Sequence, residues 1–115
     1  MEPIARTIYL SGLLDTYGLF LTERQRLVLS RHLDEDLSLQ EIAEQEGISR
    51  QGVHDAIRRG EQQLLSFEAG LHLYQLRRDT LRALGKLRPY RDRLPEAGAA
   101  ALEALDELWE DEHGL

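Results

Sequence analysis

The 115-residue sequence predicts an all-α protein. Apolar residues recur at steps of three and four along most of the chain, as they do on the buried face of a helix. Residues 22–25 (TERQ) and 38–41 (SLQE) have the spacing of a capping box, which marks the start of a helix. Leucine is abundant, whereas aromatic residues make up only 6% of the chain. This composition favours helices that pack on one another through aliphatic side chains.

The first two helices precede a short acidic connector, residues 34–36. Pro3 suits the first turn of a helix over residues 3–17, and Gly18 can end that helix. Thr22 is the expected N-cap of the second helix. The apolar residues assigned to these two helices are Ile4, Ile8, Leu10, Leu13, Leu14 and Tyr17, then Leu27, Val28, Leu29 and Leu33.

Residues 38–59 (SLQEIAEQEGISRQGVHDAIRR) predict a helix-turn-helix, in which two helices are joined by a tight turn. Ala43 leaves room where the two helices cross. Gly47 can adopt the left-handed backbone that ends the first helix. Ser49 can cap the second helix by accepting a hydrogen bond from a backbone N–H. The inward-facing residues of the turn and the second helix are Ile48, Val53, Ala56 and Ile57.

The outward face of the second helix holds the candidate nucleic-acid-binding residues. In a DNA-binding helix-turn-helix, this face lies against the major groove. Arg50 and Arg58 could contact phosphates or a guanine edge, and Gln51 could pair with adenine. Asp55 shares this face and repels phosphate. The residues assigned to nucleic-acid binding are Ser49, Arg50, Gln51, His54 and Arg58.

The charge of the motif leaves a second interpretation open. Residues 38–59 hold three basic and four acidic side chains, so their formal charge is 3 − 4 = −1, and the whole chain carries −7. Most of the free energy of nucleic-acid binding comes from neutralising phosphates. The motif could therefore serve only as a scaffold. The arginines that precede it, Arg24, Arg26 and Arg31, are interpreted as solvated surface.

A helical extension follows the motif. No proline interrupts it until Pro89, and Gly60, Gly70 and Gly85 are candidate breaks. Its two apolar faces are more than one small core needs, so one of them is expected to contact a partner chain. The first face holds Leu64, Phe67, Leu71, Tyr74 and Leu81, and the second holds Leu73, Leu76, Leu84 and Leu87.

A turn over residues 89–95 (PYRDRLP) is predicted before a last helix over residues 96–112, because a residue that precedes proline avoids the helical region. The last helix carries Leu102, Leu105, Leu108 and Trp109 on one side. We therefore divide the chain into a helix-turn-helix domain, residues 1–65, and a C-terminal helical extension, residues 66–115, which serves packing or dimerisation.

Charge is segregated in this extension. Residues 77–93 hold seven basic and two acidic side chains, so their formal charge is 7 − 2 = +5. Residues 96–112 hold seven acidic side chains and no basic one. The favoured interpretation is that the acidic helix lies against the basic segment, within or between subunits. The alternative is a basic patch for RNA or DNA.

No catalytic, cofactor or metal site is predicted. The sequence has no cysteine, which excludes disulfides, thiolate zinc sites and cysteine nucleophiles. No two of its four histidines have the i, i+4 spacing of a helical zinc site, and neither a phosphate-binding glycine loop nor a nucleophile elbow is present. It shows no secretory signal, and no apolar run approaches the roughly 20 residues of a membrane span. We therefore expect a non-enzymatic, cytoplasmic protein.

Three motifs at fixed spacing, LT-x-x-QR, DLSL-x-EIAE and ISRQ-x-VHDAI-x-R, lie within residues 21–64. This region resembles the YlxM-type family of small bacterial helix-turn-helix proteins, and it is also similar to the last, promoter-reading region of sigma factors. The following SFEAGLHLYQ, residues 66–75, matches the YlxM-type pattern better. The resemblance implies an all-α homodimer in the bacterial cytoplasm that is linked to the signal recognition particle pathway.

Three functional hypotheses follow. The first is a non-enzymatic regulatory protein of the signal recognition particle pathway, which acts through DNA, through the particle RNA or through the particle GTPase. The second is a DNA-binding transcription regulator unrelated to secretion. The third is a protein-interaction module that uses the helix-turn-helix only as a scaffold.

Overall fold

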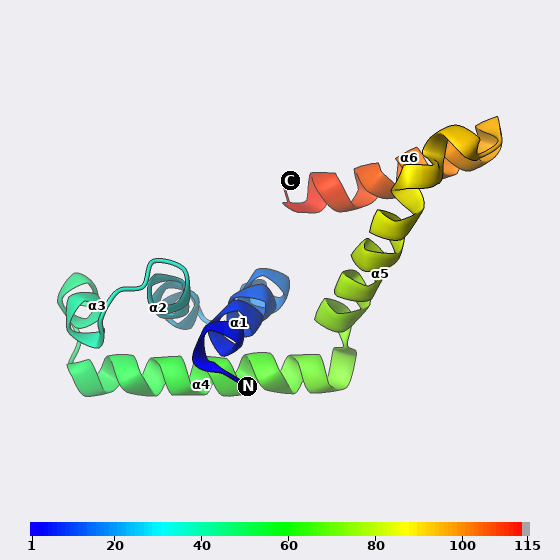
Figure 1. Ribbon diagram of the computed structural model, residues 1–115. Helices are drawn as coiled ribbons and strands as arrows, with labels where there is room; N and C mark the ends of the chain where they lie inside the picture. The colour runs from blue at the N-terminus through cyan, green and yellow to red at the C-terminus, as the bar shows by residue number, and fades with distance from the viewer. Residues whose placement is uncertain (114–115) are drawn as a thin grey trace. The chain divides into compact units, whose positions relative to one another are not determined.

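The computed structural model describes residues 1–113, with side chains up to Trp109, and this part of the chain is helical without strands. It contains six α-helices (Figure 1) and two short 3₁₀ helices, Gly18–Phe20 and Arg88–Arg93. The predicted all-α class is confirmed. The α-helices are α1 (Pro3–Tyr17), α2 (Glu23–Leu33), α3 (Leu39–Glu46), α4 (Arg50–Leu71), α5 (Leu73–Leu87) and α6 (Glu96–His113).

The chain divides into two compact units, and the second begins at Gln75. The sequence-based boundary between residues 65 and 66 lies inside α4. The assignment of residues 66–115 to packing or dimerisation stays a prediction. In the part of the chain that is described, every helix is too short or too polar to cross a membrane.

Both predicted capping boxes are present. The Gln25 backbone N–H donates to Thr22 Oγ1 at 3.1 Å, and the Thr22 N–H donates to Gln25 Oε1 at 3.2 Å. At the start of α3, Ser38 and Glu41 exchange the same pair of hydrogen bonds, each 3.1 Å long. Each box provides side-chain acceptors for two backbone N–H groups that a helix start otherwise leaves to water. These local contacts explain why α2 and α3 begin where the sequence predicts.

The predicted helix-turn-helix is also confirmed. The α3 helix ends at Gly47, whose φ of 66° lies in the left-handed region that glycine adopts at little steric cost. The α4 helix begins after Ser49, whose side chain accepts a 2.9 Å hydrogen bond from the Gly52 N–H. The residues of the motif that are buried in the core are Ile42, Ala43, Val53 and Ile57.

The core of the first unit forms where α1, α2 and α3 pack along one side of α4 (Figure 1). Gly60 allows α2 to approach α4 closely, because a Cβ at this position would lie 2.5 Å from Leu29 Cδ1. Gly12 plays the same part on α1, where the ring of Tyr74 covers it. The largest fully buried side chains are Tyr17, Leu10, Leu13, Leu29, Ile42, Leu64, Val28 and Val53.

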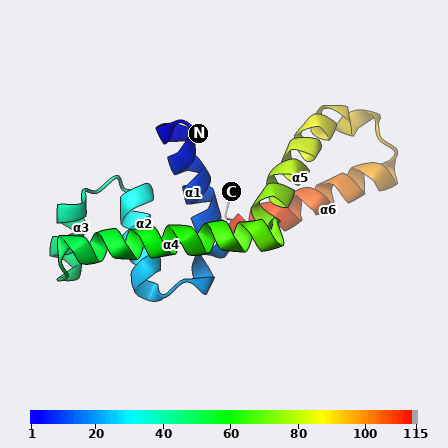
Figure 2. The same cartoon turned by 90° about the horizontal axis from the view of Figure 1, so that it is seen from below.

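The apolar face of α1 is buried only in part. Leu10, Leu13, Leu14 and Tyr17 belong to the core, as expected. Ile4 and Ile8 were expected on the same face, but they are 69% and 64% exposed. This end of α1 contacts α4 through the 3.0 Å ion pair of Arg6 with Glu61, while α1 itself runs on past α4 (Figure 2).

The break between α4 and α5 lies at His72 and not at a glycine. His72 adopts φ 55°, a left-handed backbone that is unusual for a residue with a Cβ, and its N–H donates to the Glu68 carbonyl at 2.9 Å. Gly60 and Gly70, the nearer of the expected breaks, remain helical. The prediction of the break was therefore wrong. Leu71, expected on the buried face, is 56% exposed beside this turn.

A buried polar network surrounds this turn. The Tyr17 hydroxyl donates to Glu68 Oε1 at 2.6 Å and accepts a 3.0 Å hydrogen bond from the Leu73 N–H. The Tyr74 N–H donates to the same Glu68 oxygen at 3.1 Å. Glu68 is only 6% exposed and Tyr17 is fully buried. The network therefore satisfies the first N–H groups of α5, which have no partner within the helix.

In the second unit, the acidic helix contacts the basic segment of the same chain. Arg88 donates two hydrogen bonds to Asp106 Oδ1, at 2.9 and 2.7 Å, and Arg91 lies 3.5 Å from Glu103. Leu84 and Leu102 are buried in this unit. The favoured interpretation of the charge segregation is thus confirmed for the side chains that the structure describes. Those of Glu110, Asp111 and Glu112 lie outside that part.

Candidate nucleic-acid interface

All five residues assigned to nucleic-acid binding lie at the N-terminal end of α4. Ser49 is the N-cap, and Arg50, Gln51, His54 and Arg58 project from the first turns. Each of them is exposed. The inward residues Val53 and Ile57 are buried against α2 and α3, so they fix which face of the helix points outward.

The acidic side chains of α3 have partners of their own. Glu46 forms a 2.7 Å ion pair with Arg31, and its side chain is only 14% exposed. Glu41 belongs to the capping box, and Glu44 accepts a 3.1 Å hydrogen bond from Gln40. The interpretation of Arg31 as solvated surface was wrong, because the packing of α2 on α3 brings it to Glu46. Adding Arg31, the partner of Glu46, brings the formal charge of the motif from −1 to 0, while Glu41 and Glu44 keep their charges.

Asp55 is the acidic residue on the outward face of α4, and it is held by its neighbours. Its Oδ1 accepts a 3.0 Å hydrogen bond from Gln51 Nε2 and lies 3.8 Å from His54 Nδ1. The bond to Asp55 fixes the amide of Gln51 and leaves its oxygen and its second N–H free to pair with a base. Both hydrogen-bonding functions of an adenine-reading glutamine are therefore retained.

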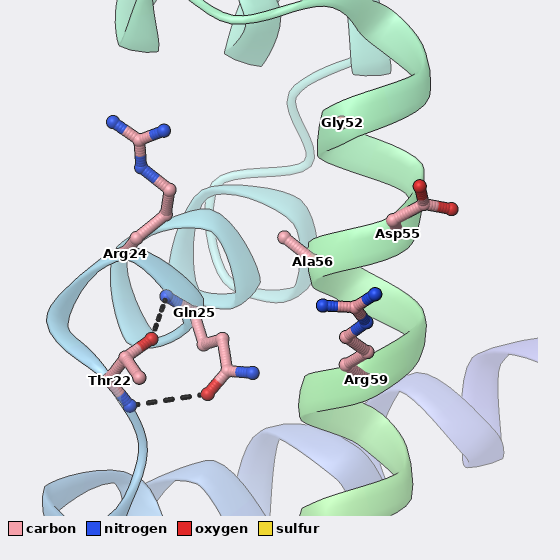
Figure 3. Close-up of a pocket in the computed structure, with 7 residues that line it drawn as sticks. All are labelled: Thr22, Arg24, Gln25, Gly52, Asp55, Ala56 and Arg59. Carbon is pink, nitrogen blue, oxygen red and sulfur yellow. Dashed lines mark hydrogen bonds between the residues drawn. The ribbon is translucent and has the colours of Figure 1, made fainter.

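Four arginines on this side of the first unit have no ion pair with any residue of the described part. Two of them, Arg50 and Arg58, were assigned from the sequence. The other two, Arg24 and Arg59, line a hollow of about 440 Å³ between α2 and α4 (Figure 3). The residues that line this hollow are Thr22, Arg24, Gln25, Gly52, Asp55, Ala56 and Arg59.

A second hollow, of about 250 Å³, adjoins the first and is lined by Asp55, Arg58, Arg59 and Gln62. Together the two hollows hold three arginines and one aspartate, so their formal charge is 3 − 1 = +2. The local charge is positive although the chain as a whole carries −7. Such a local field attracts polyanions whatever the sign of the net charge.

Sequence reasoning missed Arg24, Gln25, Arg59 and Gln62 as members of this surface. Arg59 and Gln62 follow Asp55 at helical steps of four and seven, and this spacing was a usable signal for them. No local signal existed for Arg24 and Gln25, because only the packing of α2 on α4 brings them to this face.

The side chains of this surface are mainly hydrogen-bond donors. Residues 1–109 bring no three metal-ligating side chains together.

Comparison with known proteins adds a family. The family described as "Putative helix-turn-helix protein, YlxM / p13 like" (UPF0122) matches residues 4–93. A UPF0122 protein of Clostridium botulinum is 50% identical over 68 residues, which are 59% of this chain and 62% of the relative. One of Symbiobacterium thermophilum is 43% identical over 94 residues, 81% of this chain and 88% of the relative. The chain thus spans about three fifths of the length of its clostridial relatives.

Proposed function

Because the chain belongs to the UPF0122 family of YlxM/p13-like helix-turn-helix proteins, we propose that it is a non-enzymatic regulator that binds nucleic acid through the outward face of α4. One observation supports this proposal most directly. The arginines around this face lack ion pairs within the described chain, whereas the carboxylates of the motif are already engaged. The surface can therefore neutralise phosphates without first breaking contacts of its own.

The five exposed residues at the start of α4 contact the nucleic acid in this proposal. Arg50 and Arg58 present guanidinium groups to phosphates or to a guanine edge, and Gln51 pairs with adenine. Ser49 and His54 add polar contacts at the rim. Asp55 holds Gln51 in place, at the cost of some repulsion toward nearby phosphates.

The finer proposal concerns the partner. The resemblance on residues 21–75 supports the RNA of the signal recognition particle as the nucleic acid, with the particle GTPase as a protein partner and a cytoplasmic homodimer as the acting form. Exposed leucines support the dimer, because Leu76 is 61% exposed and Leu108 is 68% exposed. Duplex DNA is the competing ligand, and it would make the protein a transcription regulator.

The proposal is tested by replacing the two arginines on α4, singly, with Arg50→Ala and Arg58→Ala. Each change is expected to lower the affinity for nucleic acid by about eightfold at 0.1 M salt. One phosphate contact changes log K by about 0.9 for each tenfold change in salt, and we take its contribution as negligible at 1 M salt. Fluorescence anisotropy with labelled particle RNA and with random duplex DNA measures the effect. Arg26→Ala is the matched control, because it removes the same charge from an exposed position on α2, beside Gly18.

The outcomes separate the hypotheses. Unchanged affinity of both variants would remove Arg50 and Arg58 from the interface. A selection from random duplexes that enriches a palindromic site would favour the transcription regulator. If the wild-type protein binds the particle GTPase but no nucleic acid at low salt, the helix-turn-helix is a scaffold.

A further inference from the structure

The hollow between α2 and α4 (Figure 3) is lined on the α4 side by residues that alternate along the helix with those proposed to read bases. Its floor on α4 is formed by small residues, Gly52 and Ala56. Ala56 is half-buried against the core, and a Cβ at Gly52 would lie 3.2 Å from Ser49 Oγ. No long side chain therefore rises from this part of α4 to fill the space.

The polar groups that face the hollow are mainly donors. Gln25 Oε1 already accepts from the Thr22 N–H, so the amide nitrogen is its free end, and Figure 3 shows this nitrogen on the side of α4. Arg24 on α2 and Arg59 on α4 line the hollow, and both are exposed without an ion pair in the part of the chain described. A donor-rich, positively charged hollow is complementary to an anion that only accepts, such as a phosphodiester.

Asp55 is the one carboxylate in the lining, and it does not neutralise the arginines. Its Oδ1 accepts from Gln51 Nε2, and Figure 3 shows the carboxylate pointing away from α2. The charge on the α2 side of the hollow therefore remains positive.

We propose that this hollow binds the phosphodiester backbone of the nucleic acid, and that Arg24 and Arg59 neutralise neighbouring phosphates on the strand beside the reading face. Gln25 donates a hydrogen bond to a phosphate oxygen between them. This proposal rests on the proposed function and divides its surface in two. Arg24 and Arg59 supply affinity without sequence preference, whereas Gln51 and its neighbours supply sequence preference.

The test is the double variant Arg24→Ala/Arg59→Ala, measured by anisotropy with duplex DNA and with structured RNA across a range of salt. We expect the affinity to fall about sixtyfold at 0.1 M salt, and the slope of log K against log salt to become shallower by about 1.8, since each phosphate contact contributes about 0.9. The loss should be equal for all sequences tested. Both residues are exposed, so circular dichroism should report an unchanged fold.

Arg26→Ala is the matched control for charge. Arg26 lies on the same helix but packs beside Gly18, where a Cβ would be 3.7 Å from its Cδ. Arg26→Ala removes one charge and the double variant removes two, so a general charge effect would make Arg26→Ala lose about eightfold, half of the double variant's loss on a logarithmic scale. A loss of that size in Arg26→Ala would overturn the proposal. Normal nucleic-acid binding by the double variant would also overturn it.

The two proposals fail in distinguishable ways. If the wild-type protein binds nucleic acid and Arg50→Ala weakens that binding, but the double variant binds as tightly as wild type, only the backbone-binding hollow is refuted. If the wild-type protein binds neither DNA nor RNA at low salt, the proposed function fails, and the hollow fails with it.

Discussion

Replacing Gly60 with alanine is expected to lower the free energy of unfolding by about 1–3 kcal/mol, the usual cost of overpacking a filled core. The added Cβ would lie 2.5 Å from Leu29 Cδ1 and 3.2 Å from Leu29 Cγ. Leu29 is fully buried, so it cannot turn outward into solvent to make room for the added group. Urea denaturation followed by circular dichroism measures the change.

Gly70→Ala is the control for this prediction. Gly70 lies in the same helix, and nothing is within 4 Å of a Cβ built there. Alanine at this position should therefore raise the free energy of unfolding by about 0.5–1 kcal/mol through helix propensity alone. If Gly60→Ala raised the free energy of unfolding as much as Gly70→Ala does, close packing of α2 on α4 at Gly60 would be refuted.

The contrast between these two glycines shows which part of the fold was readable from the sequence. Capping boxes, the left-handed Gly47 and the cap at Ser49 depend on residues within a few positions of one another, and the structure has them where the sequence predicts. Gly60 and Gly70 looked alike in the sequence, and both were candidate breaks. Only tertiary packing distinguishes a glycine that touches Leu29 from one that faces open space.

The break at His72 was missed for the same reason. Histidine is only a weak local signal for a left-handed backbone, because it is enriched there but the conformation still costs an L-residue about 1–2 kcal/mol. The strain is tolerated because Glu68 and Tyr17 take up the N–H groups of Tyr74 and Leu73. Tyr17 lies 51 positions before Glu68, so no local pattern could connect them.

The charge of the candidate interface was misjudged because it was summed along the chain. Counting residues 38–59 gave −1. In space, Glu46 faces Arg31 across α2 and α3, whereas Arg24 joins Arg59 at the hollow. The sign of the field at a surface depends on which charges remain unpaired there, and pairing is a property of the packed helices. The residues on the outward face of α4 were predictable, because a single helix determines them.

Tyr17→Phe is expected to lower the free energy of unfolding by about 2–4 kcal/mol at pH 7, since it removes one hydrogen bond to a buried carboxylate and the acceptor of a part-buried N–H. The aromatic packing of Tyr17 on Phe67, with ring centroids 5.7 Å apart, is retained in the variant. Tyr90→Phe serves as the control, because Tyr90 is 52% exposed. Loss of this exposed hydroxyl should change the free energy of unfolding by less than about 0.5 kcal/mol. Equal stability of the two variants would refute an energetic role for the network.

The same substitution should alter the response to alkali. Burial and the neighbouring Glu68 raise the pKa of Tyr17 above its ordinary value of 10.0. Between pH 10 and the raised pKa, the unfolded chain loses the Tyr17 proton while the folded chain keeps it. Stability therefore falls as the pH rises, by up to about 1.4 kcal/mol per pH unit for this residue. Phenylalanine has no proton to lose, so the stability difference between wild type and Tyr17→Phe should be constant below pH 9 and shrink above pH 10. A difference that stays constant up to pH 11 would contradict a buried, protonated Tyr17 beside Glu68.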